Sequence, residues 1–329
     1  MADDTGERTR RQGRARALIA IAVIGFALAA APAVFQMFSR APAGGDMIDD
    51  FDRYMTVAEI EQFRGYLDLI DAADAEVTDS VVPALLETGA VEDGTTFGSI
   101  ESLHTQWPDI DADMTDLLDT MNSNLGNFDS VASLPPFALF PWFFFLPGLI
   151  VGIAALVTLA MVRRGRSGRA GALLLVVLGV AIVLAPAVFQ MFTRAPDGAA
   201  MIDDFRPMMT EERVGRVQGY FITMGAAEGE IRNKVAPLVA DEDLQVTVTA
   251  TEQFSDEWPT IVGNFAPMVA TMGDNIDNFE GIDALPTFSL FPWFFVIPGL
   301  LITALAVFAS RSPDLPISQP KGNNHDLTQ

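Results

Sequence analysis

Four long apolar runs constrain most strongly what this chain can fold into. None of them contains Asp, Glu, Lys, Arg or His, and they cover residues 17–38, 137–162, 170–192 and 288–310. An α-helix needs about 20 residues to cross the roughly 30 Å hydrocarbon core of a bilayer, and every run is longer than that. The sequence therefore predicts four transmembrane helices.

The first run also has features of a cleavable signal peptide. Five arginines precede it, and small residues end it at positions 29–31. However, Pro32 directly follows these small residues and disfavours cleavage. Nearly the same sequence recurs in the middle of the chain at 184–194, where it can only belong to a span. We therefore expect the first run to be retained as a membrane anchor.

The distribution of charge predicts the orientation of the spans. Segments 1–16, 163–169 and 311–329 together hold eleven basic and five acidic residues. Segment 39–136 holds three basic and twenty-one acidic residues, and segment 193–287 holds six and seventeen. Lys and Arg collect in the cytoplasmic segments of membrane proteins. Both termini, including a disordered C-terminal tail, are therefore predicted to be cytoplasmic, and both long segments extracytoplasmic, in a multi-pass protein of the plasma membrane.

The acidic balance and the lack of cysteine exclude several classes of protein. The net charge is −23 at pH 7, whereas phosphate backbones are bound by basic faces, so nucleic acid is not an expected partner. Because the chain has no cysteine, its long segments must hold together by packing and not by disulfides. The expected partners are the lipid bilayer and other membrane or envelope proteins, including a second copy of this chain.

The chain carries the same sequence unit twice. The twelve residues 31–42 return almost unchanged as 185–196, so corresponding positions lie 154 apart. Leu-Phe-Pro-Trp-Phe-Phe at 139–144 returns as 290–295, with corresponding positions now 151 apart. This change of register requires a length difference between the two copies, which falls in the loop between Leu85 and Trp107.

We define residues 17–162 as repeat 1 and residues 170–310 as repeat 2. Each repeat contains two of the predicted spans, so both repeats enter the membrane in the same orientation. Such parallel repeats are related by a pseudo-two-fold axis along the membrane normal. The predicted fold is an all-α membrane protein, in which a tandem duplication provides four transmembrane helices and two extracytoplasmic helical hairpins.

Apolar residues three or four positions apart predict an amphipathic helix in each long segment. In repeat 1 these residues are Ile100, Leu103, Trp107, Ile110, Met114, Leu117, Met121, Leu125 and Phe128. Thr56 and Thr210 are expected to cap an earlier helix, and Pro108 and Pro259 suit the first turn of a helix that begins there. We therefore expect one antiparallel hairpin per repeat, four outer helices in total, with the two hairpins packed on each other.

Ten side chains are candidates for interaction or ligand binding. They are Asp49, Asp50, Asp203, Asp204, Trp107, Trp258, Trp142, Trp293, Gln36 and Gln190. The aspartates could bind a cation or act as acid and base, or favour the start of a nearby helix in salt bridges with Arg40 and Arg194. The tryptophans of Phe-Pro-Trp-Phe-Phe are typical of an aromatic belt at the membrane surface. The glutamines could bond between helices or line a polar path.

No motif for catalysis or for a cofactor occurs in the sequence. HExxH, GxSxG, the P-loop and the dinucleotide fingerprint are all absent. Asp109, Asp111 and Asp113 have the spacing that opens an EF-hand loop, but Met114 and Thr120 stand where that loop needs Gly and Glu. A solvated helix face is the preferred interpretation of these aspartates. We predict that the protein is not an enzyme and holds no cofactor or metal.

Two functions remain after this reading. Ion pumps usually carry ionisable residues inside the membrane, and these spans have none. The favoured function is a structural or accessory protein whose acidic extracytoplasmic helices bind other envelope proteins. The alternative is an extracytoplasmic module that binds or senses a lipid or small molecule and works with a separate output or transport subunit. A hydrophobic cavity between the hairpins would favour the alternative, and a solid seam the favoured function.

Overall fold

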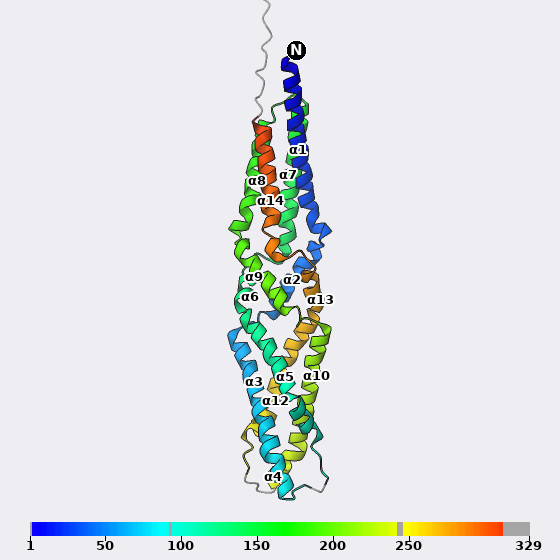
Figure 1. The fold of residues 1–329 in the computed structure, drawn as a ribbon, viewed down its shortest axis with the longest axis vertical. Helices are drawn as coiled ribbons and strands as arrows, with labels where there is room; N and C mark the ends of the chain where they lie inside the picture. Colours follow the sequence, from blue (N-terminus) through cyan, green and yellow to red (C-terminus); the bar gives the residue numbers. More distant parts are fainter. Residues whose placement is uncertain (1, 92–93, 242–245, 312–329) are drawn as a thin grey trace, which may run out of the picture. The chain divides into compact units, whose positions relative to one another are not determined.

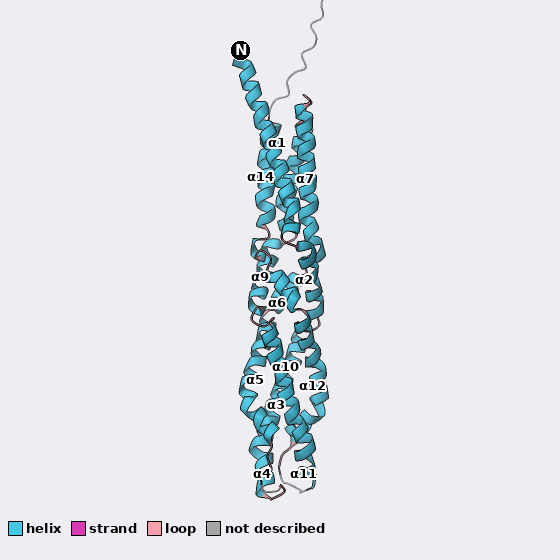
Figure 2. Ribbon diagram, turned by 90° about the vertical axis from the view of Figure 1, so that its right-hand side faces the viewer, coloured by secondary structure: helices cyan, strands magenta, loops and turns pink. Residues whose placement is uncertain are grey.

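The computed structural model describes residues 2–91, 94–241 and 246–311, with the side chains of these ranges except at 2–10 and 241. The described residues form helices and no β-strand (Figures 1 and 2). Apart from Arg311, the predicted C-terminal tail lies outside the described residues.

The chain divides into two compact units, which alternate along the sequence. We call one the span unit; it comprises Met1–Met37, Phe140–Phe189 and Pro292–Gln329. We call the other the loop unit; it comprises Phe38–Leu139 and Gln190–Phe291. Each unit therefore contains residues from both sequence repeats.

The span unit is made of helices that are long and apolar enough to cross a membrane. They are α1 (Ala2–Val34), α7 (Phe140–Arg163), α8 (Arg169–Val188) and α14 (Trp293–Ser310). Both α1 and α8 pack against α7 and against α14 (Figure 1). Many of their large apolar side chains, among them Ile150, Val177 and Leu300, are exposed, as a surface that faces lipid requires. The prediction of an all-helical chain with four such helices is confirmed.

Glycines allow the helix pairs of the span unit to approach closely. A Cβ atom added to Gly148 on α7 would lie 2.5 Å from the amide nitrogen of Ala29 and 2.6 Å from the carbonyl oxygen of Gly25 on α1. On α8 and α14, a Cβ atom on Gly179 would lie 3.0 Å from the carbonyl oxygen of Gly299. Helices in lipid associate through such small residues, because no hydrophobic force drives them together there.

The first helix of each repeat ends earlier than its apolar run. α1 ends at Val34 and α8 at Val188, and each is followed by a turn in which Gln36 or Gln190 has left-handed backbone, with φ of 55° and 54°. This conformation is unusual for a residue with a side chain. The next helix begins directly after the glutamine in both cases, so the two glutamines lie in turns and not inside a span.

The loop unit contains more helices than the four that were expected. In chain order they are α2 (Met37–Phe51), α3 (Val57–Glu76), the π-helical η1 (Val77–Val81), α4 (Val82–Glu87), α5 (Gly98–Ser123), α6 (Leu125–Ala132), the 3₁₀-helical η2 (Phe137–Leu139), α9 (Met191–Phe205), α10 (Glu211–Glu230), the π-helical η3 (Ile231–Val235), α11 (Ala236–Asp241), α12 (Thr249–Asp274), α13 (Ile276–Asp283) and the 3₁₀-helical η4 (Phe288–Leu290).

The additional helices α2 and α9 fall in segments for which no helix was predicted. Pro42, Gly44 and Gly45 in α2 have low helix propensity. Tertiary packing compensates, since α9 packs against α6 and a Cβ atom on Gly44 would lie 2.9 Å from Ile282 Cδ1 of α13. Helical stability in proteins comes mostly from such contacts and less from propensity.

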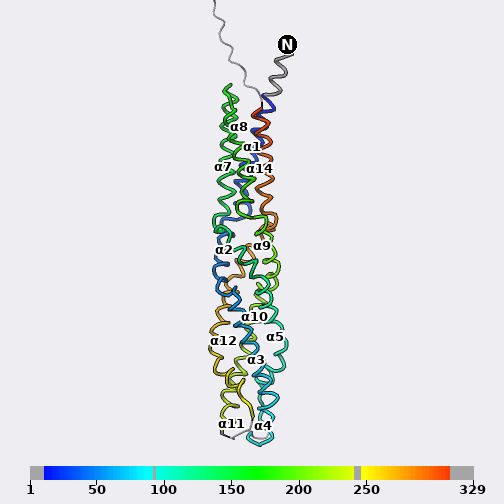
Figure 3. The backbone as a smooth tube through the Cα atoms, turned by 90° about the vertical axis from the view of Figure 1, so that its left-hand side faces the viewer, coloured from blue at the N-terminus to red at the C-terminus, as the bar shows by residue number. Residues whose placement is uncertain are grey.

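The long helices of the loop unit pack across the two repeats. α3 packs against α5 of its own repeat and against α12, while α10 packs against α12 and against α5 (Figure 3). Thr56 and Thr210 cap α3 and α10 as predicted, because their hydroxyl oxygens each accept a backbone N–H bond at 3.2 Å. In contrast, Pro108 and Pro259 lie inside α5 and α12, so the prediction that helices begin there is wrong.

The predicted apolar seam of α5 is buried. Its buried residues include Ile100, Leu103, Trp107, Ile110, Met114, Leu117 and Met121. The 3–4 spacing runs straight across Pro108, which explains why the helix continues through this proline. The proline removes one backbone donor, but the apolar contacts on both sides of it hold the helix together.

Candidate functional site

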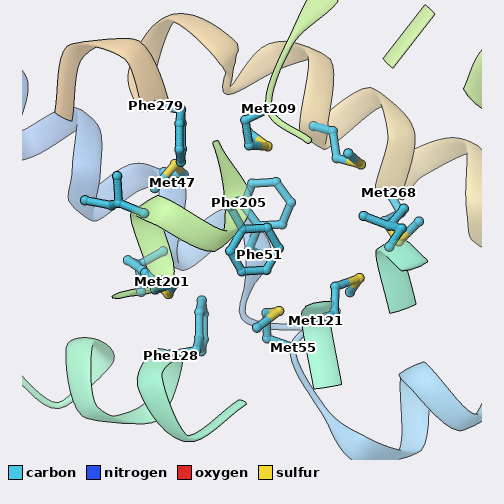
Figure 4. A pocket seen from close by; sticks show the side chains of 14 residues that line it. Met47, Phe51, Met55, Met121, Phe128, Met201, Phe205, Met209, Met268 and Phe279 are labelled. Carbon is cyan, nitrogen blue, oxygen red and sulfur yellow. The ribbon is translucent and has the colours of Figure 1, made fainter. Parts of the chain in front are cut away.

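A small apolar cavity lies where helices of both repeats meet in the loop unit. Its volume is about 50 Å³, and no polar group contributes to its surface. Fourteen residues line it: Met47, Ile48, Phe51, Met55, Leu117, Met121 and Phe128 from repeat 1, and Met201, Ile202, Phe205, Met209, Met268, Met272 and Phe279 from repeat 2. Figure 4 shows these side chains around a common space.

The lining residues come in equivalent pairs. Each lining residue of repeat 1 has its counterpart in repeat 2 at the offset of the sequence repeat, for example Met47 with Met201 and Met121 with Met272. Seven of the fourteen are methionine, which is half of the methionines in the whole chain. Methionine has three rotatable bonds and a polarizable sulfur, so it adapts to the shape of an apolar ligand.

Two buried asparagines connect the repeats beside the cavity. Asn124 Nδ2 donates to Asp204 Oδ2 at 3.0 Å, and Asn275 Nδ2 donates to Asp50 Oδ2 at 3.0 Å. Both asparagines are essentially unexposed. Since a buried amide without a partner is costly, these bonds hold α2 and α9 against the helix ends opposite them and keep the cavity lining in place.

The prediction that Arg40 and Arg194 form salt bridges with the aspartates is wrong. Arg40 and Arg194 donate to the carbonyl oxygens of Ala284 and Ser133, at 3.5 Å and 2.7 Å, and not to the aspartates. Arg40 and Asp50 are ten residues apart on the single helix α2, which separates them by about 15 Å along its axis. Proximity in sequence therefore does not bring these side chains together.

All four aspartates of the two pairs are exposed, including Asp49 and Asp203, which do not bond to the asparagines. Asp203 forms a salt bridge of 2.8 Å with Arg206, while no polar contact of Asp49 is seen among the described residues. No group of three or more potential metal ligands occurs in the part of the chain that the structure describes. One aspartate of each pair thus accepts a bond from a buried asparagine of the other repeat, and nothing in the geometry of the pairs gathers them into a cation site.

The four candidate tryptophans lie in two different settings. Trp107 is buried in the loop unit, where its Nε1 donates to Asp71 Oδ1 at 2.7 Å, and Trp258 packs edge-on against Phe254. Trp142 and Trp293, in the span unit, are 45 % and 49 % exposed. That exposure suits the aromatic-belt interpretation, and none of the four lines the cavity.

Carboxylates that the sequence reading missed cap the long helices across the repeats. Glu230 Oε2 accepts the backbone N–H groups of Ser99 at 2.8 Å and Ile100 at 3.0 Å, at the start of α5. Glu76 Oε2 accepts the N–H and the hydroxyl of Thr251, both at 2.7 Å, at the start of α12. Burial disfavours ionisation of Glu230, but the bonds from Lys234 and these N–H groups outweigh it and lower the pKa of its carboxyl.

A second missed pair of contacts involves tyrosines. Tyr220 Oη donates to Asp113 Oδ2 at 2.7 Å, and Asn264 Nδ2 donates to Tyr66 Oη at 2.7 Å. Burial, followed by the bond to Asp113, raises the pKa of Tyr220 to about 12. Arg213 also forms a salt bridge with Asp113, so the interpretation of Asp113 as part of a solvated helix face is wrong.

The single histidine among the described side chains contacts an aspartate. His104 Nδ1 lies 2.7 Å from Asp74 Oδ2, and this bond raises the pKa of His104. Burial raises the pKa of Asp74, although the histidine opposes that effect. The counterpart of His104 in repeat 2 is Ser255, so this contact belongs to one repeat alone, and neither His104 nor Asp74 lines the cavity.

A signal for the missed contacts was present in the sequence. Asn124 and Asn275, like Glu76 and Glu230, occupy equivalent positions of the two repeats. Polar residues retained at buried-face positions in both copies were therefore the better candidates.

When the chain was compared with known proteins, no family model matched it and no curated protein was found to be similar.

Proposed function

We propose that the loop unit is an extracytoplasmic module that binds a small apolar ligand, such as the end of an acyl chain, and that it works with a separate output or transport subunit. The observation that carries this proposal is the cavity, because its lining is wholly apolar and rich in methionine. A seam without free volume would have favoured the scaffold function instead.

The size of the cavity indicates the kind of ligand. One water-sized group needs about 10–15 Å³, so a cavity of about 50 Å³ accommodates roughly three to five such groups. Water gains nothing there, since it requires two to four polar partners. A narrow hydrocarbon chain end fits both the volume and the chemistry, and rotation of Met121 or Met272 adapts the lining to its length.

We also infer a tandem duplication with a pseudo-two-fold axis and both termini in the cytoplasm. The paired contacts support the duplication: Asn124 with Asp204 corresponds position by position to Asn275 with Asp50. The excess of arginine in the short segments supports the orientation. The acidic loop unit then lies outside the cell membrane, where a ligand or an envelope protein can reach it.

The orientation is testable with single cysteines in a chain that naturally has none. Cysteine in place of Ser123 or Thr260, both exposed in the loop unit, should react with a membrane-impermeant thiol reagent in intact cells. Cysteine in place of Ser167, in the turn between α7 and α8, should react only after permeabilisation. Reaction of the Ser167 variant alone in intact cells would reverse the inferred orientation.

Photo-crosslinking tests the ligand function. We expect a fatty acid with a diazirine at its methyl end, added to the full-length protein in mild detergent, to form adducts on the lining residues of α2 and α9. Filling the cavity with Met121→Phe and Met272→Phe together should lower the adduct yield at least about ten-fold. Added volume in a packed site costs about 1–3 kcal/mol, so folding of the variant must be verified by its melting temperature.

A matched control is Met224→Phe, because Met224 is buried in α10 and does not line the cavity. It should leave the adduct yield within about two-fold of wild type. Unchanged crosslinking of the filled variant, or adducts confined to the span unit, would contradict the ligand function. Co-purification of stoichiometric envelope proteins from native membranes, with no crosslink in the cavity, would instead support the accessory function.

A further inference from the structure

A buried arginine lies at the amino-terminal end of α8 in the span unit. Arg14, on α1, is 8 % exposed, and its Nε and Nη2 atoms have no hydrogen-bond partner among the described residues. A buried charge is strongly destabilising unless an opposite charge and hydrogen bonds compensate it. The position of Arg14 therefore calls for an acceptor with negative charge.

The described side chains of the span unit supply no such acceptor. Residues 11–37, 140–189 and 292–311 contain no Asp or Glu. The charged side chains of the turn between α7 and α8 are all exposed arginines: Arg163, Arg164, Arg166 and Arg169. No described carboxylate of the span unit therefore neutralises Arg14, and the arginines of the turn favour the approach of a further anion.

The cap of α8 lies directly against the guanidinium of Arg14. Gly168 is the N-cap residue and has no side chain that could bond to the first turn, while the N–H of Arg169 donates to Ser167 Oγ at 3.4 Å. A Cβ atom on Gly168 would lie 3.0 Å from Arg14 Nη2 and 2.6 Å from Val162 Cγ2. Glycine therefore leaves room for the guanidinium beside the first turn of α8, whose initial N–H groups have no acceptor within the helix.

We propose that Arg14 and the amino-terminal end of α8 bind a phosphate group, carried by an anionic phospholipid headgroup or free in solution. A guanidinium binds phosphate through parallel charge-assisted hydrogen bonds. The N-terminus of α8, a helix of twenty residues, offers N–H groups and a favourable dipole. The exposed arginines of the turn raise the local concentration of anions. This site is independent of the cavity in the loop unit.

Native mass spectrometry of the full-length, delipidated protein tests the lipid source, with phosphatidylglycerol added in mixed micelles. We expect one retained lipid per chain, and at least about ten-fold less retention in Arg14→Gln. Arg14→Lys keeps the charge but loses the forked geometry, so it should fall between the two. The control is Arg16→Gln, an exposed arginine on the same helix, which should stay within about two-fold of wild type.

Inorganic phosphate tests the other source. A rise in the melting temperature of wild type, absent in Arg14→Gln and obtained without lipid, would assign free phosphate to the site. If Arg14→Gln does not fold, Gly168→Ala replaces it, since the added Cβ displaces the guanidinium. Equal lipid retention by wild type and Arg14→Gln, with no phosphate effect, would overturn the proposal.

Discussion

Replacement of Gly148 by leucine is expected to separate α1 from α7 and to abolish a monodisperse span unit. The Cβ atom alone would lie 2.5 Å from the amide nitrogen of Ala29 and 2.6 Å from the carbonyl oxygen of Gly25. These are backbone atoms that cannot rotate away, so the two helices must move apart along their length. The cost should reach or exceed the roughly 3 kcal/mol at the upper end of ordinary overpacking.

Fluorescence-detected size-exclusion chromatography after heating measures this effect in the full-length protein. The matched control is Gly65→Leu, the same substitution on the exposed side of α3, where no other atom lies within 4 Å of an added Cβ. Leucine has a higher helix propensity than glycine by nearly 1 kcal/mol, so the control should be neutral or stabilising. A Gly148→Leu protein that elutes and melts like wild type would refute the close-approach explanation.

The second large effect is expected from Phe265→Ala in the loop unit. Phe265 is 1 % exposed, and its ring stacks on Phe63 of α3 with a centroid distance of 4.3 Å. Its ring also packs against the rings of Tyr66 and Phe221, with centroid distances of 6.1 Å and 5.3 Å. Truncation of such a phenylalanine costs about 3–5 kcal/mol, which for a unit of this size lowers the melting temperature by roughly 6–20 °C.

The sequence repeat provides an internal control for this substitution. Position 265 corresponds to Met114 in repeat 1, so Phe265→Met installs the residue that the other copy carries at a fully buried position. Methionine fills more of the space than alanine, so Phe265→Met should lower the free energy of unfolding by only about 1–2 kcal/mol. Hydrogen exchange is measured at the amides of α3 and α12, so that it reports on the loop unit and not on the span unit. Equal protection in Phe265→Ala and wild type would contradict a central role for this aromatic cluster.

Properties that depend on neighbouring residues could be predicted from the sequence. Hydropathy over about 20 residues identified the four apolar helices, because the length of a span depends only on bilayer thickness. The 3–4 spacing identified the buried side of α5, and Thr56 and Thr210 identified two helix starts. In each case the deciding interactions lie within a few turns of one helix.

The fine structure of the loop unit could not be predicted in the same way. No helix was predicted at α2 and α9, which contain proline and glycine residues, yet contacts with α6 and α13 hold them helical. Pro108 read as a helix start, but apolar contacts before and after it carry α5 through. Both errors arise because tertiary packing stabilises these helices by more than a single proline or glycine destabilises them.

The sequence by itself determined that the chain has four apolar helices, two acidic amphipathic segments and a duplicated pattern. Only the tertiary structure decided which polar groups meet, such as Glu230 with Ile100 and Asn124 with Asp204, and that methionines from both repeats surround one apolar cavity. The physical reason is that periodicity shows which side of a helix is buried. It does not show which residue, often more than a hundred positions away, lies opposite.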